Sequence, residues 1–146
     1  MSNALGWSHS IRNQATLPSS TGEGKIAFIH PADIAAVATT ALNTDNYDGH
    51  ALVITGPEAL SYRAMAATIG TAIGKPVDFE HISDEQARAD TVKRAGEGPY
   101  VDALVDIWRA VRQGRLDTMT DGVRQAIGRE PITFAQWATE NAASFL

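Results

Sequence analysis

The chain contains no cysteine, and this absence excludes disulfide bridges and thiol chemistry. A cysteine-free composition is compatible with the cytoplasm, which is the compartment that we expect. No apolar run approaches the roughly 20 residues of a membrane helix. The start also lacks the basic, apolar and small-residue regions of a signal peptide. We therefore expect no membrane partner.

Basic residues are outnumbered, with 12 Lys and Arg against 17 Asp and Glu, for a net charge of −5. Nucleic acid is excluded as the expected partner, because phosphate binding needs a basic face. Metal binding has little support, since the four histidines are scattered without a paired ligand at helical spacing. They are His9, His30, His50 and His81. The length of 146 residues and the apolar content of 44% predict a single domain over 1–146 with a sizeable core.

The most informative stretch predicts strand, helix, strand, turn and helix between residues 25 and 74. Two short apolar runs, 25–29 and 51–54, are typical of buried strands. Pro31 suits the first position of the helix between them. Ser61 predicts the N-cap of the second helix, which carries Tyr62 on its apolar face and which Gly74 should end.

Helices are predicted for most of the remaining chain, and their apolar spacing places Trp108, Phe134, Trp137 and Phe145 in the core. Capping boxes at Ser83 and Thr133 open two of them. An edge strand is expected over 77–82, and a polar loop over 17–24. The expected apolar face of the first helix in the informative stretch consists of Ile34, Val37, Ala38, Ala41 and Leu42.

Three segments together resemble the C-terminal half of NmrA-like proteins, which are atypical short-chain dehydrogenase/reductase relatives that bind NAD(P). These segments are IAFIHPADIAAVATTAL, LVITGPEALSYRAMAATIGTAIGKPV and IGREPITFAQWATENAASF. The start, MSNALGWSHSIR, resembles a segment in which such proteins leave a central strand and enter a helix. The resemblance implies an α/β fold, the partial Rossmann-like C-terminal half, with a short, mainly parallel sheet and several helices.

The resemblance also implies the substrate-side portion of an oxidoreductase that moves a hydride between NAD(P) and a small-molecule acceptor. The family's Gly-rich cofactor turn is absent here, and so is the Tyr-x-x-x-Lys pair, because no lysine follows Tyr47, Tyr62 or Tyr100 by four residues. We therefore expect weak or no NAD(P) binding by this chain alone, as for a truncated protein. A non-catalytic NAD(P)-sensing or protein-binding regulatory module is the alternative, and an inactive structural fragment is a third.

Four residues are expected beside substrate or cofactor, and no catalytic residue is assigned. Asn3 and Trp7 match a family segment that runs close to the nicotinamide and the substrate, although Trp7 could equally serve in ordinary packing. His30 joins a strand end to a helix start, where it could line a crevice or simply cap the helix. Tyr100 follows a Gly-Pro loop of the kind that covers pockets, or else lies on the surface. Asp33 is interpreted as a first-turn helix residue.

The two apolar runs also predict self-association. Continuous apolar strands are normally buried on both faces, and the family's N-terminal half would cover them. Without that half, an apolar surface and a strand edge would be open, so we expect a homo-oligomer, most simply a two-fold dimer. Under this interpretation, Ile29→Asp or Val53→Asp should unfold the chain rather than merely dissociate it.

Overall fold

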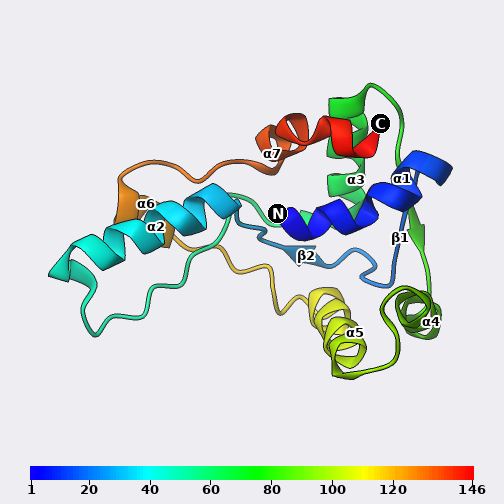
Figure 1. Ribbon diagram of the computed structural model, residues 1–146, viewed down its shortest axis with the longest axis horizontal. Coiled ribbons are helices and arrows are strands. Elements are labelled where there is room, and N and C mark those ends of the chain that lie inside the picture. The colour runs from blue at the N-terminus through cyan, green and yellow to red at the C-terminus, as the bar shows by residue number, and fades with distance from the viewer.

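The chain folds into an elongated α/β arrangement of short elements, and the computed structural model describes all 146 residues (Figure 1). The α-helices are α1 (Ser8–Gln14), α2 (Pro31–Asn43), α3 (Tyr62–Ile73), α4 (Asp84–Ala95), α5 (Pro99–Arg112), α6 (Gly122–Ile127) and α7 (Phe134–Glu140). The 3-10 helices are η1 (Ser2–Trp7), η2 (Asp45–Tyr47) and η3 (Ala142–Phe145). The strands are β1 (Thr16–Ser19), β2 (Lys25–Ile26), β3 (Leu60–Ser61) and β4 (Asp78–His81).

The four strands form two separate pairs. β1 and β4 are parallel, in a register that sets Leu17 opposite Phe79, whereas β2 and β3 are antiparallel. The prediction of β4 as a strand is confirmed, but the prediction of a loop over 17–24 is wrong at its beginning. The polar composition of β1 concealed it, although Leu17 and Ser19 alternate inward as a strand requires.

Neither predicted central strand forms as expected. Only Lys25–Ile26 of the first run pairs with another strand, and the run 51–54 pairs with none. The side chain of Val53 is 66% exposed instead of buried. A strand needs a neighbour that accepts and donates its backbone hydrogen bonds, and no other segment of this chain supplies one for 51–54.

The main core surrounds α3, whose buried face carries Met65, Ala66 and Ile69. Ser61 caps this helix by accepting a hydrogen bond from the Ala64 N–H, as predicted. Gly74 ends it in the left-handed conformation, with φ of 68°, which glycine adopts without a side-chain clash. The 14 buried residues of this main core are Met1, Ala4, Ile11, Leu17, Tyr62, Met65, Ala66, Ile69, Val77, Val111, Phe134, Trp137, Ala138 and Phe145.

A second cluster lies between α2 and α6 and contains only Val37, Val123 and Ala126 as buried residues. We call it the α2–α6 cluster. The predicted apolar face of α2 is wrong for two residues, since Ile34 is 46% exposed and Leu42 is 87% exposed. The buried side of α2 instead carries Val37 together with a charged residue, Asp33, which the apolar pattern did not take into account.

Helices α4 and α5 form a hairpin whose base is held by an ion pair. Both carboxylate oxygens of Asp84, at the start of α4, accept hydrogen bonds of 2.8 Å from Arg112, at the end of α5. The Arg112 guanidinium thereby lowers the pKa of Asp84 to about 2. Trp108, predicted to be in the core, is half-buried on α5. None of the helices is sufficiently long and apolar to span a membrane.

Candidate functional site

The first residues of the chain place Trp7 against the body of the protein. Side chains three residues apart eclipse one another in a 3-10 helix. In η1 this spacing brings Met1, Ala4 and Trp7 onto one side, where the first two are buried and Trp7 is half-buried. Asn3 lies outside this row and is exposed.

Trp7 belongs to a cluster of three aromatic rings, which we call the aromatic cluster. Its indole centroid lies 5.0 Å from the ring centroid of Tyr62 and 6.3 Å from that of Phe28. The Phe28 and Tyr62 centroids are 6.4 Å apart. These separations fall within the range of favourable offset and tilted ring pairs. Three elements therefore meet at this point: η1, the segment after β2, and the first turn of α3.

The rings differ in their exposure. Tyr62 is buried, at 5% exposed, whereas Trp7 and Phe28 are each half-buried. Burial raises the pKa of Tyr62 to about 12. Its hydroxyl makes no hydrogen bond within the protein, is not one of the fully buried unpaired atoms, and remains a protonated donor at neutral pH.

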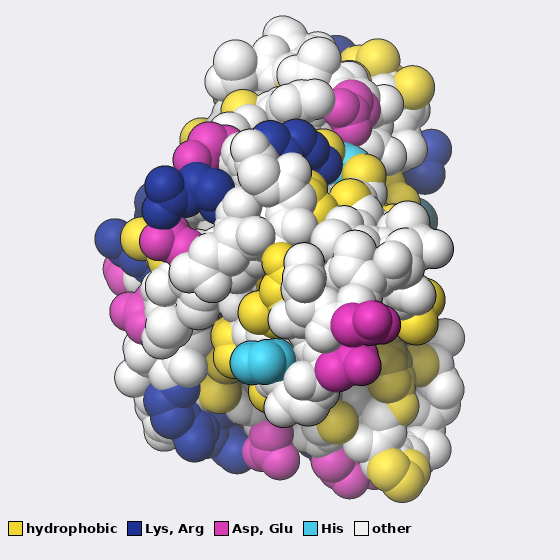
Figure 2. Space-filling model, turned by 90° about the vertical axis from the view of Figure 1, so that its left-hand side faces the viewer, with side chains coloured by type: hydrophobic (Ala, Val, Ile, Leu, Met, Phe, Trp, Pro, Cys, Tyr) yellow, Lys and Arg dark blue, Asp and Glu magenta, His cyan; other side chains and the backbone are white.

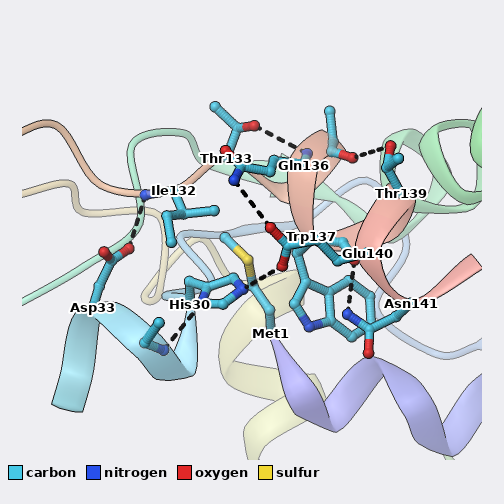
Figure 3. Close-up of polar contacts among 12 residues, drawn as sticks. Met1, His30, Asp33, Ile132, Thr133, Gln136, Trp137, Thr139, Glu140 and Asn141 are labelled. Atoms are coloured by element: carbon cyan, nitrogen blue, oxygen red, sulfur yellow. Dashed lines mark hydrogen bonds and ion pairs between the residues drawn. The ribbon is translucent and has the colours of Figure 1, made fainter. Parts of the chain in front are cut away.

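His30 caps α2 and connects it to α7 (Figure 3). Its Nδ1 accepts a hydrogen bond of 3.0 Å from the Ala32 N–H, so the ring proton lies on Nε2. This Nε2 donates to Oε2 of Glu140 at 3.2 Å, and Gln136 donates to Oε1 of the same carboxylate at 3.0 Å. Both ring nitrogens are therefore occupied, and the interpretation of His30 as a capping residue is confirmed.

Asp33 forms a second connection from the first turn of α2 (Figure 3). Its carboxylate is fully buried, and Oδ2 accepts a hydrogen bond of 2.8 Å from the Ile132 N–H. Oδ1 lies 2.7 Å from the guanidinium of Arg129. Asp33 is thus a first-turn helix residue, as predicted, and it also holds the connection between α6 and α7 against α2.

Tyr100 lies apart from the other three predicted residues. It is 65% exposed in the first turn of α5, which Figure 1 shows well separated from η1. Trp7 and His30, in contrast, belong to adjoining segments, because Trp7 contacts Phe28, two residues before His30.

The sequence reasoning missed Phe28 and Tyr62 as possible site residues. Phe28 was assigned to a buried strand, and Tyr62 to the apolar face of α3. Aromatic residues that flank two predicted element boundaries were a usable signal, because such boundaries line ligand crevices in α/β proteins.

A cavity of about 380 Å3 lies elsewhere, beside α6. Its lining consists of Gly56, Pro57, Met119, Thr120, Asp121, Arg124, Glu130 and Pro131. Arg124 contacts Asp121 at 2.8 Å and Glu130 at 3.7 Å, and all three side chains are more than half exposed. The one cation is outnumbered by two carboxylates, so this hollow offers no free positive charge to an anionic ligand.

The residues present do not fit the pyrophosphate of a dinucleotide. Such a site needs a glycine turn between a strand and the N-terminus of a helix. After β1 the chain passes through a glycine-containing loop to β2, and no helix follows directly. β4 does lead to α4, but the first turn of α4 carries two carboxylates, Asp84 and Glu85, which would repel phosphate. No group of three or more metal-binding side chains occurs either.

The chain is similar in sequence to NAD(P)-dependent reductases. It is 34% identical over 145 residues to an NAD(P)H azoreductase of Xenophilus azovorans. It is 30% identical over 145 residues to a (4-alkanoyl-5-oxo-2,5-dihydrofuran-3-yl)methyl phosphate reductase of Streptomyces griseus. Each match covers 99% of this chain but 51% of the relative, so the chain spans about half the length of these relatives. No protein-family model matches the chain.

The fold is that of Rossmann-like NAD(P)-binding reductases. The NADPH-dependent quinone oxidoreductase of Escherichia coli, solved with NADPH, superposes with a TM-score of 0.86 at 22% identity. That match covers 95% of this chain and 49% of the other. A triphenylmethane reductase of Citrobacter sp., solved with NADP(H), gives 0.82 at 16% identity, over 94% and 48%. At these identities the structures establish the α/β fold alone.

Proposed function

We propose that this chain is the substrate-side portion of an NmrA-like, NAD(P)-dependent oxidoreductase that reduces a small organic acceptor. The observation that carries the proposal is the similarity, over 99% of the chain, to two reductases whose names specify reductive chemistry on small molecules. Residues 1–146 would act as one domain, and Asn3 and Trp7 would face the acceptor. The adjacency of His30 and Tyr100 to a ligand stays a prediction.

The geometry supports separate roles for the two halves of the complete protein, with one half binding the cofactor and the other half binding the acceptor. This chain has an aromatic cluster with two half-exposed rings, but it has no glycine turn for a pyrophosphate. The half that the chain does not span would then hold the NAD(P), and the present half would orient the acceptor. We accordingly expect the 146-residue chain to bind NADH or NADPH weakly or not at all.

A joined protein tests this function. The chain would be fused behind the N-terminal half of the Xenophilus azovorans azoreductase, and oxidation of NADPH would be followed with an azo dye as the acceptor. We expect turnover by the joined protein and none by either half alone. A folded, joined protein that binds NADPH without oxidising it would instead favour the alternative, a non-catalytic NAD(P)-sensing or protein-binding regulatory module.

Calorimetric titration of the isolated chain with NADPH tests the expected lack of cofactor binding separately. A dissociation constant in the micromolar range, with one site per chain, would contradict the proposed division between the halves. No binding at concentrations that saturate the joined protein is the expected result.

We also propose that the isolated chain forms a homodimer, in the cytoplasm. The support comes from α2, whose only charged residue, Asp33, is buried, so its outer surface carries exposed Ile34 and Leu42 without charge. Figure 2 shows the end of the molecule that Figure 1 draws on the left, where hydrophobic side chains reach the surface between charged groups. A second copy can pack against the uncharged outer surface of α2.

Light scattering on a gel-filtration column tests the dimer. Leu42→Glu should produce a folded monomer, because it introduces a charge into the proposed interface. Ile107→Glu is the matched control, since Ile107 is also partly exposed but lies on α5. A wild-type chain that elutes as a monomer at tens of micromolar would rule the dimer out.

A further inference from the structure

The aromatic cluster combines features that ordinary packing does not require together. Two rings, Trp7 and Phe28, keep part of their surface in solvent, although three elements converge around them. Beside them, the Tyr62 ring is buried, while its hydroxyl makes no hydrogen bond within the protein and keeps contact with solvent. A phenol whose ring is buried and whose hydroxyl reaches solvent can donate its proton either to water or to a bound ligand.

A ligand could satisfy all of these groups at once. A flat aromatic ring system gains most from stacking on other rings, with centroids roughly 4.5–7 Å apart. A carbonyl oxygen or azo nitrogen on the same ligand would accept the proton that the Tyr62 hydroxyl offers. Charge plays no part here, since none of the three side chains is charged at neutral pH.

We propose that Trp7 and Phe28 form the stacking wall for a planar aromatic acceptor, and that the Tyr62 hydroxyl donates a hydrogen bond to the acceptor's carbonyl or azo group. This inference rests on the proposed function, because it names the class of acceptor and its binding residues. It concerns binding alone, and it requires neither NAD(P) nor hydride transfer.

The relation of the three residues to the fold explains how the wall is held. The 3-10 spacing directs Trp7 inward from η1, and the Ser61 cap fixes Tyr62 at the first position of α3. Gly56 allows the chain to pass directly over Phe28, since a Cβ atom there would lie 1.9 Å from the Phe28 carbonyl oxygen. Each ring therefore has its own local anchor.

The first test uses the unaltered 146-residue chain and menadione, a planar quinone. The three indole N–H signals in an NMR spectrum report on Trp7, Trp108 and Trp137 separately. We expect the Trp7 signal to shift with saturation, while the Trp108 and Trp137 signals stay in place. Binding that leaves the Trp7 signal unmoved would overturn the stacking wall, and so would the absence of binding up to the solubility limit of menadione.

The second test separates the ring from the hydroxyl. Tyr62→Phe keeps the ring but loses the hydroxyl. It should weaken menadione binding by about two- to tenfold, which is the effect of one hydrogen bond. The binding of 2-methylnaphthalene, which has no carbonyl, should not change. Trp7→Leu should weaken both ligands by about three- to tenfold through the loss of stacking, and Trp108→Leu should weaken neither. If Tyr62→Phe affected both ligands equally, the hydroxyl would have no role as a donor.

These outcomes are distinct from a failure of the proposed function. The joined protein reports NADPH oxidation whether or not Trp7 contacts the acceptor. Turnover with an unmoved Trp7 signal would therefore contradict the proposed stacking wall and support the proposed reductase function. Menadione binding at Trp7 without turnover by the joined protein would support the proposed stacking wall and contradict the proposed reductase function.

Discussion

Around α3, 14 buried hydrophobic side chains from the two ends and the middle of the sequence pack together, whereas between α2 and α6 the buried hydrophobic residues are only Val37, Val123 and Ala126. Both regions contain helices with sound sequence signals, and the caps of α2 and α3 form as predicted. The difference lies in what surrounds each helix. Local signals therefore specify a helix equally well in a dense region and in a sparse one.

Polar contacts replace part of the missing apolar packing in the α2–α6 cluster. The Thr120 N–H donates to Thr55 Oγ1 at 2.9 Å, and Thr120 Oγ1 donates to the Val53 carbonyl at 2.6 Å. Tyr47 donates to the Gln125 carbonyl at 3.2 Å. Each such bond contributes only about 0.5–1.5 kcal/mol net. We therefore expect this region to open locally before the main core does.

A cavity in the main core should give the largest effect. Ile69→Ala removes part of a fully buried side chain and should lower the free energy of unfolding of the whole chain by about 2–5 kcal/mol. Urea denaturation measures this change. Val123→Ala, also fully buried, is the counterpart in the α2–α6 cluster. The Val123→Ala substitution should speed hydrogen exchange in α2 and α6 while leaving α3 protected. Equal acceleration of exchange in all three helices would contradict the distinction between the two regions.

Alkaline pH should weaken the main core through Tyr62. The pKa of Tyr62 is about 12 in the folded protein and about 10 in the unfolded chain, so the unfolded chain loses its proton first. The associated stability is complete below about pH 10 and is lost as the pH rises toward about 12, by up to about 3 kcal/mol. Tyr62→Phe should remove this component from the pH profile of thermal unfolding. A variant with the unaltered alkaline profile would show that Tyr62 is not buried.

Loss of the buried charge in α2 should have a smaller effect. Asp33→Asn keeps the shape of the side chain and an acceptor for the Ile132 N–H, but it loses the attraction to Arg129, whose side chain is 45% exposed. Because that exposure screens the ion pair, we expect a cost of about 1 kcal/mol, with faster hydrogen exchange at Ile132. Asp121→Asn, at an exposed pair with Arg124, is the control and should change stability by less than about 0.5 kcal/mol.

The smallest effect is expected at Val53, where the strand interpretation and the structure disagree. A buried strand residue replaced by Asp would unfold the chain, but at 66% exposure Val53→Asp should change stability by less than about 0.5 kcal/mol. Leu52→Asp is the matched control. Because Leu52 packs against the α2–α6 cluster, this substitution should destabilise the protein. Circular dichroism during heating compares the two variants. If the Val53→Asp variant were unfolded, the interpretation of residues 51–54 as a buried strand would be restored.

The elements that could be predicted were those with local causes. The caps at His30, Ser61, Ser83 and Thr133 form as expected, because a capping bond joins residues two or three positions apart. The inward placement of Phe134, Trp137 and Phe145 near the C-terminus is confirmed as well. The run 51–54 was mistaken for a strand because its apolar residues say nothing about whether a neighbouring strand exists.

The candidate site divides in the same way. The sequence by itself determined the helices, their caps and the absence of a glycine turn, since each depends on residues close together in the chain. Only the tertiary structure decided that Trp7, Phe28 and Tyr62 meet, that Tyr100 lies apart, and that Asp33 is buried beside Arg129. Such contacts join residues far apart in sequence, and they form only when the packing of whole elements brings those residues together.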